Sequence, residues 1–434
     1  MITAEIAADS ISPKGDRVIT LLVTFPRIIL AEVNTHRALS KNTSSSRAIP
    51  FNKMVKAVQN NPFIPIAWQK DHKGMQGIKY FENEKEIKAK VNCWLSARNN
   101  AIKLAKFLNS DLVVHEISGE EFISYNQLDE DSIESLRAKE RLKDTKVTKQ
   151  ICNRLLEPFM WTTMLITGSK EGWDNFFKLR NPEYHLENVP TVGEGLSLSD
   201  ETITLVGKSK RQLIEEINSI DNDNYAAFKT KVREYDSLDW LKMNKSQAEI
   251  HISTLAECIY DAMNESTPQK LAEGEWHLPF GNNLEPEKLI PLASSILTKH
   301  KRERSIPLDE LQETIDMLAV KIVTSMAART SYTIVGEEKK VSYEDHIKLH
   351  DNLVKQNPPH SSPAEHASRA MTSREYYSFA KTYVTNNLTE GIKEDVKKGK
   401  TTVKEKGDFY EVTEFGWCRN IRGFIQYRHI LETE

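Results

Sequence analysis

Residues 34–47 read Asn34-Thr35-His36-Arg37-Ala38-Leu39-Ser40-Lys41-Asn42-Thr43-Ser44-Ser45-Ser46-Arg47. This stretch concentrates a histidine, two arginines and several hydroxyl groups, which are donors suited to phosphates and to the polar edges of rings. By composition alone it is either an anion-binding loop or a solvated serine-rich loop, because loops are often built from such residues.

The spacing H-R-x-x-S-x-N-x-x-S-x-R in this stretch resembles the signature of the flavin-dependent thymidylate synthases, the ThyX family, which is usually written R-H-R-x-x-S-x-N-x-x-S-x-R-Y. The positions that coincide are His36, Arg37, Ser40, Asn42, Ser45 and Arg47. Residues 20–30 also resemble the strand, proline and helix start that lead into the family's signature. The resemblance favours a binding loop over a solvated one.

Other stretches resemble the same family. Residues 153–158 (N-R-L-L-E-P) and 174–180 (D-N-F-F-K-L-R) are similar to the family's arginine-bearing helix, its Asn-Phe pair and its Leu-Arg pair. Residues 246–250 (S-Q-A-E-I) resemble the A-Q-x-E-I that normally follows that Leu-Arg pair closely. Here a polar excursion over residues 181–245 separates the two, and we interpret it as a mobile segment or a lid.

The last stretches that resemble the family are out of order. Residues 327–332 (A-A-R-T-S-Y) and 362–366 (S-P-A-E-H) resemble the A-A-R-V-S-F and T-P-F-E-H segments that precede the signature in ordinary members. In this chain they follow it. We therefore predict a circularly permuted ThyX-like domain, which is physically reasonable because domain termini often lie close together at the surface.

The expected fold is α+β, with an antiparallel sheet flanked by helices and with helical insertions. We expect a single elaborated domain whose core comprises residues 1–50, 146–180, 244–264 and 307–434. The insertions are residues 51–145, 181–243 and 265–306.

Local patterns predict several elements of this fold. Alternating apolar residues around a turn-rich stretch indicate a β-hairpin formed by residues 2–6 and 17–24. Apolar residues at helical spacing predict a short helix at 28–39 and amphipathic helices at 84–108, 248–263 and 307–328. A helical pattern also covers 147–179, and Pro158 should kink or split it. Residues 116–146 are expected to be a solvent-facing insertion with a short helix, and 393–406 a basic linker or hairpin tip.

The resemblance implies roles for particular residues. His36, Arg37, Asn175, Ser331 and His366 would contact FAD. The residues implied to bind the nucleotide are Arg47 and Arg154 at its phosphate, Arg180 at the pyrimidine edge, and Ser45 beside the reacting ring. Ser45 and Arg180 are the positions implied in catalysis, since a fixed guanidinium can stabilise charge that develops on the ring. Ser45 is not required as a nucleophile, because reduced flavin supplies hydride in the family.

The chain also departs from the family's pattern. Thr35 replaces the first arginine of R-H-R, Thr43 replaces an acidic residue, Ala48 replaces the final tyrosine and Glu32 replaces a glutamine. Residues 426–429 (Q-Y-R-H), which follow Arg419 and Arg422, form a loose echo of the signature. They would either supply cationic contacts or cap helix carbonyls.

The family's activity would make this chain an enzyme that transfers a one-carbon unit from methylenetetrahydrofolate to C5 of dUMP, with FAD as cofactor and NADPH as reductant, in a homo-oligomer. One alternative is a pyrimidine-nucleotide hydroxymethylase or another C5-modifying enzyme, because the departures alter the residues around cofactor and substrate. Another is a relative that binds nucleotide without catalysis.

Composition limits the other possibilities. A formal net charge of -3 gives no reason to expect stable binding of nucleic acid. Neither a long apolar run nor a basic start followed by an apolar segment is present, so we expect a cytoplasmic protein without membrane contact. The four cysteines are far apart and are expected to be reduced. We expect no metal site, and we interpret His346 and His350 as surface or core residues. The Trp276-His277 pair is interpreted as part of an aromatic turn that packs on the core; the less favoured alternative is that it lines a pocket.

Overall fold

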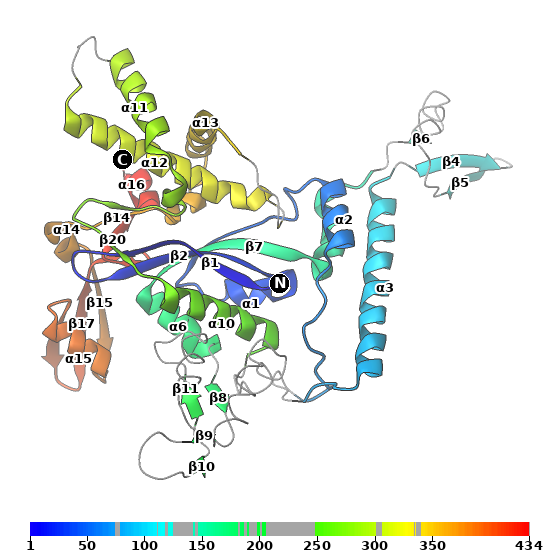
Figure 1. Ribbon diagram of the computed structural model, residues 1–434, viewed down its shortest axis with the longest axis horizontal. Coiled ribbons are helices and arrows are strands. Elements are labelled where there is room, and N and C mark those ends of the chain that lie inside the picture. The colour runs from blue at the N-terminus through cyan, green and yellow to red at the C-terminus, as the bar shows by residue number, and fades with distance from the viewer. Residues whose placement is uncertain are drawn as a thin grey trace.

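The computed structural model describes residues 1–73, 79–110, 112–117, 120–124, 142–143, 146–180, 183–185, 189–190, 198–199, 202–204, 248–300, 306–333, 335 and 340–433. The predicted lid over 181–245 and the predicted short helix within 116–146 fall mostly outside these residues. Within the described ranges, no helix combines the length and the apolar character needed to cross a membrane. The expected α+β class is confirmed, since antiparallel sheets are flanked by helices (Figure 1).

The central sheet has five strands in the order β12-β1-β2-β7-β3. Their bounds are Gln269–Lys270 (β12), Thr3–Ile11 (β1), Arg17–Pro26 (β2), Trp161–Ser169 (β7) and Ser40–Thr43 (β3). The pairing of β1 with β2 confirms the predicted hairpin, and only the short β12 runs parallel to its neighbour within this sheet. The strand β3 lies at the edge of the sheet and carries the middle of the signature.

Strand β7 corrects the predicted helix over residues 147–179. The chain there forms α5 (Lys149–Cys152), η2 (Asn153–Phe159), β7 and α6 (Lys170–Arg180). Eight of the nine residues of β7 are buried. A strand that is covered on both faces lacks the apolar and polar alternation of a half-exposed strand, so its apolar run resembles that of a buried helix.

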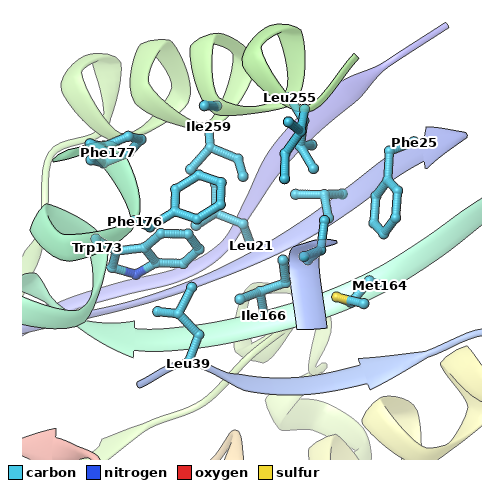
Figure 2. Close-up of a cluster of buried hydrophobic side chains, with 14 of the residues drawn as sticks. Leu21, Phe25, Leu39, Met164, Ile166, Trp173, Phe176, Phe177, Leu255 and Ile259 are labelled. Atoms are coloured by element: carbon cyan, nitrogen blue, oxygen red, sulfur yellow. The ribbon is translucent and has the colours of Figure 1, made fainter. Parts of the chain in front are cut away.

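One face of the sheet packs against α6 and α10 (Ile250–Glu265). In Figure 2, Phe176 of α6 and Leu255 and Ile259 of α10 point toward Leu21 and Ile166 of the strands. Because side chains alternate along a strand, Thr20 and Thr167 point to the opposite face. α10 confirms the helix predicted for 248–263.

The opposite face of the sheet contacts the segment around η6 (Ser362–Glu365), β13 (Trp276–His277) and β19 (Ile421–Arg422), and α12 (Leu308–Arg329) packs on η6. α12 confirms the helix predicted for 307–328. It packs against α11 (Pro286–His300) and α13 (Tyr343–Val354). His346 and His350 of α13 are buried, which is one of the two positions expected for them. Residues 265–306, expected as an insertion, contribute β12 to the central sheet and β13 (Trp276–His277) to a second sheet.

The remaining segments extend from this core. α3 (Glu84–Leu108) has the predicted bounds, and together with α2 (Phe51–Asn60) it packs on η2. The basic segment 393–406 forms the end of α15 (Glu390–Lys397) and β16 (Thr401–Lys406) rather than a linker or a hairpin tip.

The other elements, in chain order, are η1 (Arg27–Ile29), α1 (Leu30–Asn34), β4 (Leu112–Ile117), β5 (Glu120–Ser124), β6 (Leu142–Lys143), β8 (Glu183–His185), β9 (Val189–Pro190), β10 (Leu198–Ser199), β11 (Thr202–Thr204), η4 (Gly281–Asn283), η5 (Thr330–Tyr332), β14 (Ser368–Ala370), α14 (Ser373–Ser378), β15 (Ala380–Thr385), β17 (Phe409–Phe415), β18 (Trp417–Cys418), β19 (Ile421–Arg422), β20 (Phe424–Gln426) and α16 (Tyr427–Thr433). Of the helix predicted for 28–39, only η1 and α1 form.

Candidate functional site

The first part of the signature leaves α1 and crosses to the edge strand β3. His36 lies in this crossing and is buried. Its ring meets the Phe176 ring edge-on, with the two ring centroids 4.7 Å apart. Gly172 of α6 permits the close approach, because a Cβ atom there would lie 3.3 Å from the Ala38 carbonyl oxygen and 3.2 Å from Leu39 Cδ2. The crossing is therefore held against α6.

Arg180, the last residue of α6, contacts His36 directly. Its Nε donates a hydrogen bond to His36 Nε2 over 3.2 Å. Burial, followed by the positive charges of Arg180 and Lys41, lowers the pKa of His36 to about 4. The imidazole is therefore neutral at pH 7, and because Nε2 accepts a hydrogen bond, its proton is on Nδ1.

A carboxylate lies near the same arginine. Burial raises the pKa of Glu32, nearby Glu249 raises it further, and the charge of Arg180 opposes both. Glu32 is the position where the family has a glutamine. The substitution therefore places an ionisable group close to the Arg180 guanidinium.

The middle of the signature contacts residues 327–332, which resemble a segment that precedes the signature in the ThyX family. Asn42 Nδ2 donates to the Ala327 carbonyl oxygen, and Ser331 Oγ donates to Asn42 Oδ1 over 3.4 Å. The backbone N–H of Ser45 donates to the Ser331 carbonyl oxygen over 2.9 Å. Segments separated by nearly 300 residues thus form one junction at β3.

The end of the signature is held by η2. Asn153 is fully buried, and its Nδ2 donates to the carbonyl oxygens of Ser46, at 2.7 Å, and Ile49, at 3.0 Å. Arg47 directly follows Ser46, and Arg154 directly follows Asn153. Both arginines are exposed. The two guanidinium-bearing segments therefore lie side by side, which suits the binding of an anion.

A cavity of about 290 Å³ opens beside this junction. Its lining includes Ser44, which precedes Ser45, and Thr333, which lies two residues after Ser331. Trp161 also lines it. Two lysines of α2, Lys53 and Lys56, also line it. An apolar wall with a few polar and cationic groups is typical of pockets that bind small molecules.

His366 lies on the other face of the sheet. Its Nδ1 is 2.8 Å from Thr167 Oγ1, and Thr167 points away from α6. Burial lowers the pKa of His366 to about 3. The resemblance implies that His36 and His366 both contact FAD and that Arg180 faces the pyrimidine, but strand alternation places His366 and the His36–Arg180 pair on opposite faces of the sheet.

The two remaining residues with a predicted cofactor role are exposed. Arg37 follows His36, and Asn175 lies on the solvent side of α6. Thr35, which replaces a cation of the family, donates its hydroxyl to the Glu32 carbonyl oxygen. It does not restore the lost charge.

The echo of the signature near the end of the chain has partners of its own. Arg428 pairs with Glu365 and Glu432, Arg419 pairs with Glu432, and Arg422 pairs with Asp395. These cations are compensated within the chain. In the part of the chain that the structure describes, no group of three or more His, Cys, Asp or Glu residues could hold a metal ion.

The sequence interpretation assigned no role to Asn153, Thr20 or Thr167. Asn153 begins one of the matched stretches, but its two hydrogen bonds become visible only in the fold. Thr20 and Thr167 lie within apolar strands, and a polar residue at such a position is the signal that could have singled them out.

Comparisons with known proteins give little support for a family. No family model matches the chain, and no curated protein matches its sequence. Two solved structures of the UMP/dUMP methylase PolB from Streptomyces cacaoi are distantly similar. The one with 5-Br dUMP has 13% identity and a TM-score of 0.28, covering 46% of this chain and 83% of that chain. The one with 5-Br UMP has 14% identity and a TM-score of 0.26, covering 45% and 82%. Likeness at this level carries no argument about function.

Proposed function

We propose that this chain is a flavin-dependent enzyme that transfers a one-carbon unit from methylenetetrahydrofolate to C5 of a pyrimidine deoxynucleotide, converting dUMP to dTMP. The observation that carries the proposal is the junction at β3. Stretches that resemble one family, but stand in permuted order, meet through Asn42 and Ala327 and through Ser45 and Ser331. A chance resemblance would give no reason for these stretches to touch.

The nucleotide phosphate would bind at Arg47 and Arg154, whose segments are joined by Asn153. The cavity beside Ser44 would then receive the rest of the nucleotide. Arg180, which would face the pyrimidine edge, lies at the other end of β3. The first and last Cα atoms of this strand are about 10 Å apart, so Arg180, which contacts His36, and Arg47 lie beyond opposite ends of the strand.

The residues present suit a flavin in their chemistry. Within the described part of the chain, His366 Nε2 is buried without a hydrogen-bond partner and so can meet a polar ring edge, and the exposed Arg37 can meet a phosphate. Bound flavin would supply hydride. Because His366 and Asn175 belong to opposite faces of the sheet, we propose that a homo-oligomer completes the site with residues from two copies.

The test begins with the absorbance of the full chain before and after adding FAD. NADPH is then added under anaerobic conditions, with and without dUMP. In a second reaction that also contains methylenetetrahydrofolate, the mass of the nucleotide product is measured by mass spectrometry. Flavin bleaching and a methylated product are expected. The double variant Arg47→Ala/Arg154→Ala should lose dUMP binding, whereas Arg374→Ala, an exposed control on α14, should not. If the chain retains no flavin band once unbound FAD has been removed by gel filtration, at any FAD concentration used, the proposal is refuted.

Oligomer formation has a separate measurement. Sedimentation velocity should show a species larger than the 49.7 kDa monomer when FAD is present. A monomer that binds FAD stoichiometrically would remove the shared site from the proposal.

A second candidate is another modification of C5, such as hydroxymethylation. It is favoured by the surroundings of Arg180, where Glu32 brings a carboxylate and Thr35 brings no cation. The mass of the product distinguishes the two reactions. Nucleotide binding without any turnover would instead identify a relative that has lost catalysis.

A further inference from the structure

Five buried side chains form a continuous hydrogen-bonded chain beneath the central sheet. Ser10 Oγ lies 2.9 Å from His277 Nδ1, and His277 Nε2 lies 2.8 Å from Thr20 Oγ1. Thr20 Oγ1 lies 2.6 Å from Thr167 Oγ1, which lies 2.8 Å from His366 Nδ1. None of the five is more than 3% exposed.

Register places these groups in line. Thr20 of β2 and Thr167 of β7 are direct partners across the sheet and point away from α6 and α10. His277 comes from β13, which belongs to a second sheet, and His366 from the residues between η6 and β14. The pairing of the strands therefore supplies the middle of the chain, and two other segments supply its rings.

The two ends of the chain differ. Ser10 lines a cavity of about 530 Å³ between β1, β13 and residues 266–282, and this cavity is large and polar enough to hold water. At the other end, His366 Nε2 is buried and has no hydrogen-bond partner among the residues that the structure describes. A buried polar atom without a partner is rare and points to a ligand or a water at that position.

Both rings are neutral at pH 7. Burial lowers the pKa of His277 to about 4 and that of His366 to about 3. A neutral imidazole donates through one nitrogen and accepts through the other. If His277 donates from Nε2, then Thr20 donates to Thr167, Thr167 donates to His366 Nδ1, and the proton of His366 is on Nε2.

The opposite arrangement is also complete. If His366 donates from Nδ1, each hydroxyl donates toward His277 Nε2, and His277 donates from Nδ1 to Ser10. If both rings donated toward the threonines, two hydroxyl protons would lie between the two threonine oxygens. If both rings accepted from the threonines, no proton would lie between those oxygens. Such a mismatch costs about 1–3 kcal/mol for an unsatisfied buried group. The two rings therefore share one tautomer.

We propose that this chain is a proton relay between the cavity at Ser10 and the ligand position at His366 Nε2. A proton that binds to Nε2 releases the Nδ1 proton of His366 to Thr167. Thr167 passes its proton to Thr20, and Thr20 passes its own to His277 Nε2. His277 then releases its Nδ1 proton to Ser10, which loses a proton to water. One proton enters and one leaves, and no charge remains; the reverse order delivers a proton to the ligand.

The relay goes beyond the proposed function and does not depend on the identity of the ligand. It is tested on the full-length chain labelled with 15N-histidine, without flavin or nucleotide. Ring nitrogen shifts report the tautomers, and variants of the two histidines assign the signals. We expect His277 and His366 to show the same tautomer and to stay neutral at pH 6. Unlike tautomers would overturn the relay.

Proton movement itself is measured as exchange of the His366 ring N–H with water. Thr20→Val keeps the shape of the side chain but removes the hydroxyl, so exchange should slow by about tenfold or more because it then requires local opening. Thr24→Val, on the same strand and face, should leave the rate unchanged, and Ser10→Ala should slow it without altering the centre of the sheet. An unchanged rate in both Thr20→Val and Ser10→Ala would show that the chain only satisfies buried groups.

Discussion

Replacing Asn153 with alanine tests whether η2 holds the end of the signature. The Asn153 side chain is fully buried and donates to the carbonyl oxygens of Ser46 and Ile49, at 2.7 and 3.0 Å. Asn153→Ala removes both hydrogen bonds and leaves the two carbonyl oxygens without that donor. The segment that carries Arg47 then keeps fewer hydrogen bonds to the segment that carries Arg154, among them the one from Ser46 Oγ to Glu157.

The structure sets the size of the effect. Two lost hydrogen bonds and the desolvation of their acceptors amount to about 2–4 kcal/mol. Unfolding entropy is about 2.1 cal/mol/K per residue, or about 0.9 kcal/mol/K for 434 residues, so the midpoint of thermal unfolding should fall by about 2–4 °C. The Kd for dUMP should rise by about tenfold or more, because a charge-assisted contact to phosphate is worth about 1.5–3 kcal/mol.

Thermal unfolding followed by circular dichroism and dUMP titration by calorimetry measure the two effects. Asn386→Ala, an exposed asparagine far from the signature, is the control and should change neither. If Asn153→Ala unfolds at the wild-type temperature, the hydrogen bonds do not hold the loop. If it is destabilised but binds dUMP normally, the loop does not position the phosphate site.

Three further predictions concern pH, charge and backbone conformation. Burial lowers the pKa of His346 to about 4, so the unfolded chain binds more protons than the folded one between pH 6.5 and 4. The unfolding temperature should therefore fall as the pH drops through this window. In the His346→Gln variant it should fall less steeply. Arg180→Ala removes a charge that lowers the pKa of His36, so NMR titration should show that pKa rising; an unmoved pKa would mean that the Arg180 charge does not contribute to it. If the proposed function holds, turnover should also fall by about 100-fold. Gly416→Ala should lower the soluble yield and the unfolding temperature, because φ is +81° and a Cβ atom would lie 2.3 Å from Cε2 of Tyr376. Gly399→Ala, at φ +69° with open space around it, should lower the free energy of unfolding by only about 1 kcal/mol.

Much of the fold follows from local sequence patterns. α3, α10 and α12 form close to their predicted bounds, because apolar spacing along a helix depends on residues that are near each other in sequence. The hairpin of β1 and β2 was predictable for the same reason, since a turn-rich stretch separates two alternating strands. β7 was not, because a strand buried on both faces loses its alternation.

The candidate site divides in the same way. The signature over residues 34–47 and the later stretches that resemble the same family are visible in the sequence, and they predicted which residues would form the site. The sequence could not reveal that Ser331 reaches Ser45, nor that His366 lies on the face opposite Arg180. Both depend on which strand lies at the edge of the sheet and which way each side chain points from it.

The amino-acid sequence by itself determined the helices α3, α10 and α12, the hairpin and the set of residues that resemble one family, because each is recorded in spacings along the chain. Only the tertiary structure decided the junction at β3 and the relay through Thr20 and Thr167. Those two threonines are 147 residues apart, and they meet because β2 and β7 pair in one register. A shift of that register by one residue would turn each side chain to the other face of the sheet and break the relay.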